Sequence, residues 1–108
     1  MVAYIEQVKT GLEQRWPDSC CYVLGHLADG NLHLFVKPGY EGDTHYDSDS
    51  EIYEPLKAFG GTVSAEHGIG TEKKAWLGHS RSASEINLMR VLKNTLDPKG
   101  LLNQGRIF

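Results

Sequence analysis

Apolar residues recur at spacings of three and four over the first fifteen positions, the pattern of a helix that buries one face. The positions with this spacing are Val2, Ile5, Val8 and Leu12. Residues 16–18, Trp-Pro-Asp, interrupt the pattern, because proline lacks a backbone donor and disfavours helical geometry in the residue before it. The sequence therefore predicts a helix over residues 2–15.

Two runs of strand-forming residues, 20–27 and 31–36, flank Asp29-Gly30, and this dipeptide between apolar runs is a strong hairpin signal. With a two-residue turn, the numbers of facing residues sum to 59, so His26 faces His33 on one side of the sheet. Their Cβ atoms would then lie roughly 4.5–5.5 Å apart. The facing pairs expected on the other, core-forming side are Leu27 with Leu32 and Val23 with Val36.

Two capping boxes predict where helices start, because a serine and a glutamate three residues later each satisfy a free backbone amide. The boxes are Ser48 with Glu51 and Ser82 with Glu85. The elements that they predict are a helix near 49–59, ended by Gly60-Gly61 and preceded by a loop over 38–43, and a helix that runs to about residue 95, ended by Asp97-Pro98-Lys99-Gly100.

Between these helices, residues 62–66 predict a third strand, residues 67–70 a glycine-rich turn and residues 71–77 a short helix. The order αββαβαα is typical of an α+β fold, in which helices pack on one face of a small antiparallel sheet. We expect a ferredoxin-like piece followed by C-terminal helices. A length of 108 residues corresponds to one domain or part of one.

Composition excludes some classes of function. The net charge of −3, without a Lys/Arg-rich stretch, argues against a nucleic-acid partner. The apolar runs are far shorter than the ~20 residues that cross a bilayer, and the first residues lack the pattern of a secretory signal. Cys20 and Cys21 are neighbours and rarely bridge each other without strain, so the sequence favours a reducing, cytoplasm-like compartment.

The two hairpin histidines are candidate metal ligands. Two neutral imidazoles on one face of a hairpin can bind one divalent ion, at ~2.0–2.1 Å per bond for zinc. The alternative is a pair of polar side chains on a solvated hairpin face. The spacing of His26 and His33 alone leaves both open.

Glu66 and His67 stand where the predicted third strand meets the glycine-rich turn. A carboxylate beside an imidazole offers a hard ligand and a proton acceptor, and His26, His33 and Glu66 together would leave an open position on an ion. Gly68 would let the backbone approach a ligand closely. The alternative is a tight turn that needs glycine, with both side chains merely exposed.

Four segments in this order resemble the C-terminal domain of FAD-linked oxidases in the vanillyl-alcohol oxidase superfamily. They are residues 25–33 (GHLADGNLH), residues 61–70 (GTVSAEHGIG), Lys73, and residues 96–108 (LDPKGLLNQGRIF). They look most like the D-lactate dehydrogenase, D-2-hydroxyglutarate dehydrogenase and glycolate oxidase flavoprotein branches. The resemblance spans residues 20–108 of this chain.

The resemblance implies specific roles for individual residues. His26, His33 and Glu66 correspond to the ligands of zinc or a similar divalent ion, and His67 to the base that takes the substrate's hydroxyl proton. The residues that correspond to cofactor contacts are Asn31, Gly68, Asn103 and Arg106. Two departures stand out: the terminal Asn-Pro-Gly-Lys of the family reads Asn-Gln-Gly-Arg here, and Phe35 stands where relatives often have asparagine.

The resemblance also implies an activity for a longer protein. Residues 1–108 would be the cap fragment and tail of a flavoenzyme whose FAD-binding domain is absent from this chain. That enzyme would oxidise a D-2-hydroxy acid to a 2-oxo acid, passing a hydride to FAD, and could associate peripherally with a membrane. The expected partners are the substrate, the rest of the flavoenzyme chain and, as an option, a second copy.

We expect the 108-residue chain to fold but to be inactive alone. Two alternatives of another class remain open at this point. One is a small stand-alone metal-binding or interaction module without redox activity, and the other is a metal-assisted hydrolase that uses the same His/His/Glu set.

Overall fold

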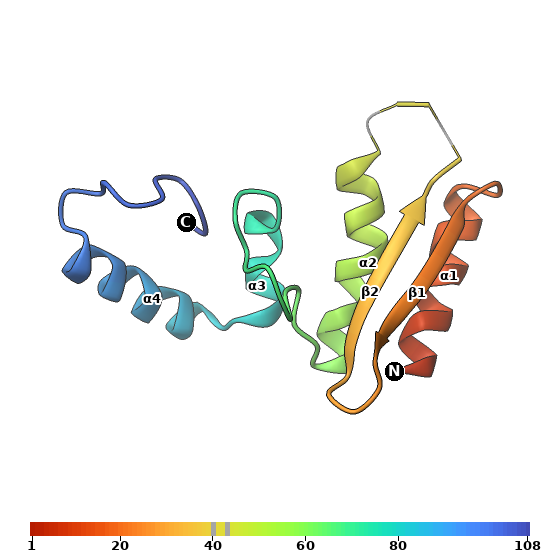
Figure 1. The fold of residues 1–108 in the computed structure, drawn as a ribbon, viewed down its shortest axis with the longest axis horizontal. Coiled ribbons are helices and arrows are strands. Elements are labelled where there is room, and N and C mark those ends of the chain that lie inside the picture. Colours follow the sequence, from red (N-terminus) through yellow and green to blue (C-terminus); the bar gives the residue numbers. More distant parts are fainter. Residues whose placement is uncertain (40, 43) are drawn as a thin grey trace. The chain divides into compact units, whose positions relative to one another are not determined.

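The computed structural model describes residues 1–39, 41–42 and 44–108, so Tyr40 and Asp43 of the predicted loop 38–43 lie outside the described residues. The chain divides into two compact units, Met1–Phe59 and Gly60–Phe108. The first unit contains α1 (Val2–Arg15), β1 (Cys20–His26), β2 (Asn31–Lys37) and α2 (His45–Phe59). The second contains η1 (Lys74–Trp76), α3 (Leu77–Ser80) and α4 (Ala83–Leu96) (Figure 1).

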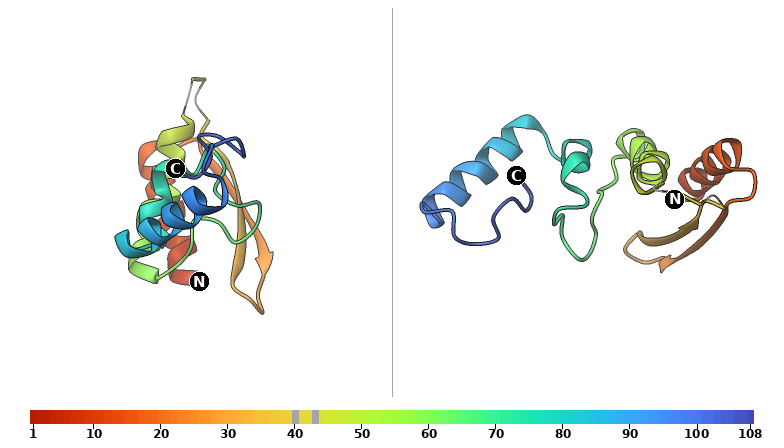
Figure 2. Two further views of the ribbon diagram at one scale, coloured as in Figure 1. Left: turned by 90° about the vertical axis from the view of Figure 1, so that its left-hand side faces the viewer. Right: turned by 90° about the horizontal axis from the view of Figure 1, so that it is seen from above.

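The first unit is a layer of two helices on one face of an antiparallel hairpin (Figures 1 and 2). Its core is centred on Tyr4, Val8 and Leu12 of α1, and Leu12 is completely buried. Partly buried side chains from every element of the unit surround this cluster: Ile5, Trp16, Cys21, Leu32, Leu34, Val36, Ile52 and Leu56. The expected α+β fold with a small antiparallel sheet is confirmed.

Helix α1 has the predicted limits, but its buried face is rotated slightly from the predicted one. Tyr4 is buried, whereas Val2 is 69% exposed. The Tyr4 hydroxyl donates a hydrogen bond to the Ile52 carbonyl (2.8 Å), and its ring meets the Phe59 ring edge-on at 5.7 Å between centroids. Burial raises the pKa of the Tyr4 phenol, so this polar group stays neutral inside the apolar core.

The hairpin has a different register from the predicted one. The partner of His33 is Leu24, and the partner of His26 is Asn31, so the numbers of facing residues sum to 57 instead of 59. The turn contains Leu27–Gly30, with Gly30 at φ +74°, the Gly30 amide bonded to the His26 carbonyl (3.0 Å) and the Asn31 amide to the Asp29 carboxylate (3.1 Å).

A longer turn shifts the register by two residues, and a shift of two leaves every side chain on its predicted face. Leu32 and Val36 therefore face the core as predicted, and His26 and His33 share the opposite face. The prediction that Leu27 faces the core is wrong. Leu27 lies in the turn and is 85% exposed.

Helix α2 begins at His45, four residues earlier than the predicted start at 49, so the capping box of Ser48 with Glu51 is wrong. The Ser48 hydroxyl instead donates to the His45 carbonyl inside the helix (3.0 Å). Glu51 pairs with Arg15 of α1 (3.3 Å), and this long-range pair replaces the local cap. Gly60, at φ +63°, comes directly after the end of α2 as predicted.

The predicted third strand, residues 62–66, is irregular, and the described sheet has two strands. Its polar groups bond locally, which competes with a strand ladder. The Val63 amide donates to the Ser80 hydroxyl (2.7 Å), and the Ser64 hydroxyl bonds to the carbonyls of Glu66 and Gly68. The short helical stretch starts at Lys74 and not at residue 71, because residues 70–73 form a turn.

Helix α4 opens with the predicted capping box. The Glu85 amide donates to the Ser82 hydroxyl (3.3 Å), and the Ser82 amide donates to the Glu85 carboxylate (2.8 Å). These bonds hold the pKa of Glu85 below its usual value, with the Ser82 amide contributing most. Among the described residues, no helix is both long and apolar enough to cross a membrane.

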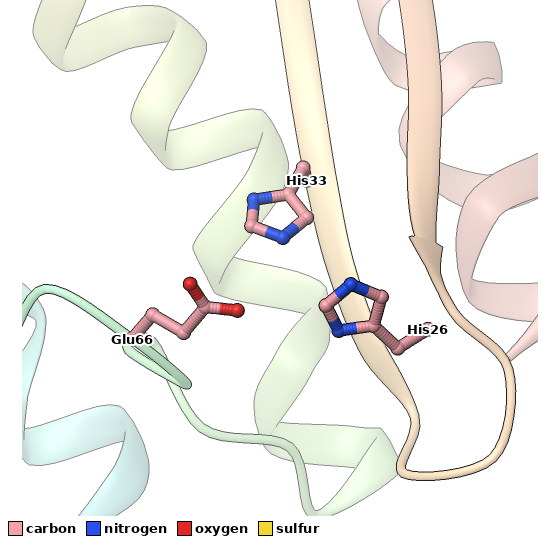
Figure 3. A group of neighbouring side chains, drawn as sticks. All are labelled: His26, His33 and Glu66. Atoms are coloured by element: carbon pink, nitrogen blue, oxygen red, sulfur yellow. The ribbon is translucent and has the colours of Figure 1, made fainter.

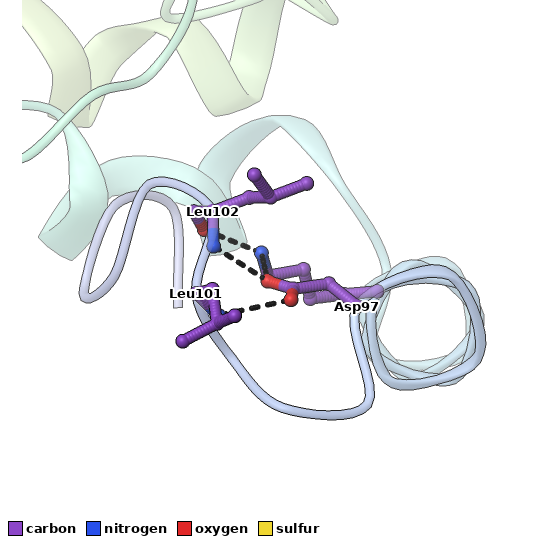
Figure 4. Close-up of polar contacts among 4 residues, drawn as sticks. Asp97, Leu101 and Leu102 are labelled. Atoms are coloured by element: carbon purple, nitrogen blue, oxygen red, sulfur yellow. Dashed lines mark hydrogen bonds and ion pairs between the residues drawn. The ribbon is translucent and has the colours of Figure 1, made fainter.

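The end of α4 is organised around Asp97, which is 8% exposed (Figure 4). Its two carboxylate oxygens accept hydrogen bonds from the Leu101 and Leu102 amides, each at 2.9 Å, and its carboxylate pairs with the Lys93 ammonium. The Lys93 ammonium also donates to the Leu102 carbonyl (2.5 Å). The Lys93 hydrogen bond, with the amides adding to it, lowers the pKa of Asp97 to about 2.

Gly25 occupies a position in the hairpin that has no room for a Cβ atom. A Cβ there would lie 2.2 Å from the Asn31 carbonyl oxygen, which is backbone and cannot move aside. We expect Gly25→Ala to lower the free energy of unfolding of the first unit by about 1–3 kcal/mol. Hydrogen exchange of the hairpin amides measures this loss for the first unit alone.

Gly11→Ala is the matched control within the same unit. Its Cβ would meet only the Glu51 carboxylate oxygen, at 2.6 Å, which ends a flexible side chain that can swing away. Alanine also favours the helix over glycine by about 1 kcal/mol. Equal losses from Gly11→Ala and Gly25→Ala would contradict the backbone clash at Gly25.

The Asp97 carboxylate makes the stability of the second unit depend on pH. A folded-state pKa of about 2, below the ordinary value of 3.8, means that ionised Asp97 stabilises the folded state above about pH 4. This contribution is lost as the pH falls from about 4 through about 2. The stability difference between the native chain and Asp97→Asn should shrink over that window in acid unfolding curves.

Carbon NMR titration of the Asp97 carboxyl measures its pKa directly. Lys93→Met removes the main cause of the shift and should move the pKa of Asp97 up toward its ordinary value. An unchanged pKa in this variant would refute the assigned cause.

Candidate metal centre and glycine-rich corner

His26 and His33 come from the two strands of the hairpin and lie diagonally across the ladder. His26 ends β1, and His33 stands opposite Leu24, two residues before His26 on the same face. Their rings meet edge-on, with centroids 5.9 Å apart and planes at 76° (Figure 3). His26 is exposed, and His33 is half-buried. The face was predicted correctly, and the direct pairing was not.

This separation fits two ligands of one ion. With metal–nitrogen bonds of ~2.0–2.1 Å and a bond angle near the tetrahedral value, two imidazole centroids would lie roughly 5 Å apart. The observed 5.9 Å is within a small side-chain rotation of that value. The imidazole pair therefore suits a borderline-soft divalent ion such as zinc.

The hairpin face around the imidazoles is apolar. Leu24, the partner of His33, is 63% exposed. Tyr22 and Phe35 are partners of each other two positions further along the ladder and are 69% and 57% exposed. Phe35 therefore lies on the same face of the hairpin as His33.

Glu66 and His67 lie in the second unit, on the irregular segment before the glycine-rich turn. Their side chains approach to 4.0 Å between the His67 Nε2 and a Glu66 oxygen. His67 has φ +58°, a left-handed conformation that is costly for a residue with a Cβ, and its side chain is 82% exposed. The bonds of Ser64 to the carbonyls of Glu66 and Gly68 hold this corner in place.

The glycines of the corner have a backbone that other residues would adopt only with strain. Gly68 and Gly70 have φ +71° and +59°, and a Cβ on either would meet nothing within 4 Å. The glycine requirement is therefore conformational and not steric. The Gly70 carbonyl accepts a hydrogen bond from the Ile107 amide (3.0 Å), which ties the C-terminal tail to the corner.

The remaining sequence-predicted site residues fall in both units. Asn31 begins β2 beside the imidazole pair, as the partner of His26. Asn103, at φ +46°, and Arg106 belong to the tail of the second unit, where the Arg106 amide bonds to the Asn103 carbonyl (3.2 Å). The structure thus brings together His26, His33 and Asn31 within the first unit, and Glu66, His67 and Gly68 within the second.

Sequence reasoning missed one concave site. A cavity of about 240 Å³ in the second unit lies between α4 and the C-terminal tail. Its lining on the α4 side consists of Arg90, Lys93 and Asn94. Their spacing of three and four residues places them on one face of α4, and this spacing was the available signal.

A small α+β domain with a histidine pair and a glutamate–histidine corner is the class that the fold and the site define. The family model for the C-terminal domain of FAD linked oxidases matches residues 2–107, nearly the whole chain. The chain therefore belongs to the family of FAD-linked oxidase C-terminal domains.

Curated relatives agree with the family match. The chain is 40% identical, over its whole length, to a D-2-hydroxyglutarate dehydrogenase of Xanthomonas citri pv. viticola, of which it covers 24%. It is 34% identical over 98% of its length to the D-2-hydroxyglutarate dehydrogenase of Stutzerimonas stutzeri, again covering 24% of that protein. A mitochondrial D-2-hydroxyglutarate dehydrogenase of Bos taurus is 46% identical over 73% of the chain and is covered to 15%. The chain spans about a quarter or less of the length of these relatives.

Proposed function

We propose that this chain is the C-terminal part of a flavoenzyme that oxidises a D-2-hydroxy acid to the 2-oxo acid. The observation that carries the proposal is the imidazole pair, His26 and His33, on one face of a hairpin in a chain of this family. The D-2-hydroxyglutarate dehydrogenases among its relatives support the class of substrate. A stand-alone metal-binding module without redox activity is not favoured, because the family match covers nearly the whole chain.

In this proposal His26, His33 and Glu66 would hold a divalent ion, which we take to be zinc. Two imidazoles and one carboxylate form a three-ligand set that leaves a coordination position for a substrate oxygen. Such an ion, when bound, polarises the 2-hydroxyl of the substrate and favours loss of its proton. The exposed His67 imidazole beside Glu66 accepts that proton.

FAD would be the oxidant in this proposal and would supply the acceptor for the hydride from the substrate carbon. We propose that Asn31, Gly68, Asn103 and Arg106 contribute to the cofactor's surroundings. Left-handed backbone at Gly68 and Asn103 supports this role, because it turns consecutive backbone amides toward one side, where they can meet a polar ligand. The FAD-binding domain itself would be supplied by the rest of the flavoenzyme chain.

The apolar hairpin face bears on which hydroxy acid is used. Lactate, glycolate and 2-hydroxyglutarate differ in the group that the hydroxyl carbon carries, and only the last has a second carboxylate. Phe35 and Leu24, on the same face as His33, favour a substrate whose hydroxyl carbon carries a short or apolar group over one with a second carboxylate.

Free thiols at Cys20 and Cys21 suit a reducing compartment, so we place the enzyme in the cytoplasm within this proposal.

The metal set is tested by elemental analysis of the purified flavoenzyme that carries this chain. His26→Ala, His33→Ala and Glu66→Gln should each lose bound metal and turnover together, because each removes a ligand. His45→Ala, in the same unit but at the start of α2, is the control and should keep both. Stoichiometric metal in the double variant His26→Ala/His33→Ala would exclude the proposed ligand set.

The role of His67 predicts a different pattern. His67→Gln should lower kcat by roughly 10²–10⁴, the usual contribution of a positioned base, with metal content unchanged. Steady-state kinetics and elemental analysis on the same preparations separate the two effects. Parallel loss of metal and turnover would show that His67 serves the ion and not the proton transfer.

A further inference from the structure

The cavity of the second unit lies between one face of α4 and the C-terminal tail. Its volume is about 240 Å³, several times the ≈30 Å³ that one water occupies in the liquid. The side chains that line it include Arg90, Lys93, Asn94, Asn103, Arg106 and Phe108. Three of these are cations, two are amides, and none is a carboxylate.

One of the three cations is already matched by an acid. The Lys93 ammonium pairs with Asp97 and donates to the Leu102 carbonyl, so its charge and its donors serve the end of α4. Arg90 and Arg106 have no acidic partner among the described residues. The side chains that line the cavity therefore carry an excess of about two positive charges, which repel each other unless an anion enters.

The Arg90 guanidinium is held in a way that suits an anion. Its Cζ atom lies over the Phe108 ring, 5.5 Å from the ring centroid, a cation–π contact that holds the side chain at the cavity. The guanidinium carries five N–H donors in a planar fork. A planar fork of donors matches the oxygens of a phosphate, and such charge-assisted bonds are about twice as strong as neutral ones.

The tail that carries Arg106 is fixed by bonds on both sides of it. The Lys74 ammonium donates to the Gly105 carbonyl (3.0 Å), and the Ile107 amide donates to the Gly70 carbonyl (3.0 Å). Asn103 and Gly105 adopt left-handed backbone, at φ +46° and +69°, which curls the tail over α4. The second arginine is therefore carried by an ordered segment and does not have to be recruited by a ligand.

We propose that this cavity is a binding site for a phosphoryl group, held between Arg90 and Arg106 with the Asn94 and Asn103 amides as further donors. A phosphate carries up to two negative charges near neutral pH and so balances the two arginines. The group could belong to free phosphate or to a nucleotide, FAD included. The site shares no residue with the proposed metal centre, but it shares Asn103 and Arg106 with the proposed surroundings of the cofactor. Its occupation does not require turnover.

Calorimetric titration of the 108-residue chain with inorganic phosphate at low ionic strength tests the site. Saturable binding of one phosphate per chain is expected, and it should weaken as salt rises, because the arginines are solvent-accessible. Arg90→Gln and Arg106→Gln should each weaken binding about tenfold or more, the effect of losing ~1.4 kcal/mol. Arg81→Gln is the matched control in the same unit, since Arg81 bonds to the Ser80 carbonyl outside the cavity (3.0 Å), and should bind as the native chain does.

Further arms identify the source of the phosphate and protect the test against misfolding. Arg90→Lys keeps the charge but loses the fork, so its affinity should fall between those of the native chain and Arg90→Gln. Tighter binding of ADP than of pyrophosphate supports a nucleotide, and equal binding supports a free phosphate. Failure of the native chain to bind any of these ligands, or equal binding by Arg90→Gln, overturns the proposal. Succinate binding as tight as that of phosphate would overturn the choice of a phosphoryl group. Because neither turnover nor metal content is measured, failure here leaves the proposed metal centre and the role of His67 untouched.

Discussion

The two-residue period of the β-strand is the constraint on which the first unit depends. Alternate residues of β2 face the α1 core, and the residues between them, including His33, face away from it. The same alternation places His26 on the outer face of β1. Core formation and the imidazole pair are therefore two consequences of one pattern, and a slip of a single residue would destroy both.

The second unit is stabilised in a different way. Its buried apolar side chains are few among the described residues, with Val63, Trp76 and Leu77 below one-tenth exposure. Polar bonds supply much of its order: the Ser82–Glu85 box at the start of α4 and the Asp97 carboxylate at its end. Polar groups that hold backbone amides fix the geometry of loops, and loops carry the Glu66–His67 corner and the tail side of the arginine-lined cavity, whose other side is α4.

The proposed metal ligands come from both units, one stabilised mainly by apolar packing and the other mainly by polar bonds. A rigid hairpin holds two imidazoles at a fixed separation, and a strained, glycine-rich corner presents a carboxylate and a third imidazole. Strain at a residue such as His67 is typical of functional segments, because the surrounding bonds must maintain it. Phe35 and Leu24 add an apolar surface on the same hairpin face as the imidazole pair.

The sequence by itself determined the elements whose signals are local: α1 from apolar spacing, α4 from its capping box, and the face shared by His26 and His33 from strand alternation. It also carried the motifs of the family. Only the tertiary structure decided the four-residue turn, the early start of α2 and the loss of the third strand. Each of these depends on competition between local bonds and distant partners, such as Arg15 with Glu51 or Val63 with Ser80, which no short window of sequence contains.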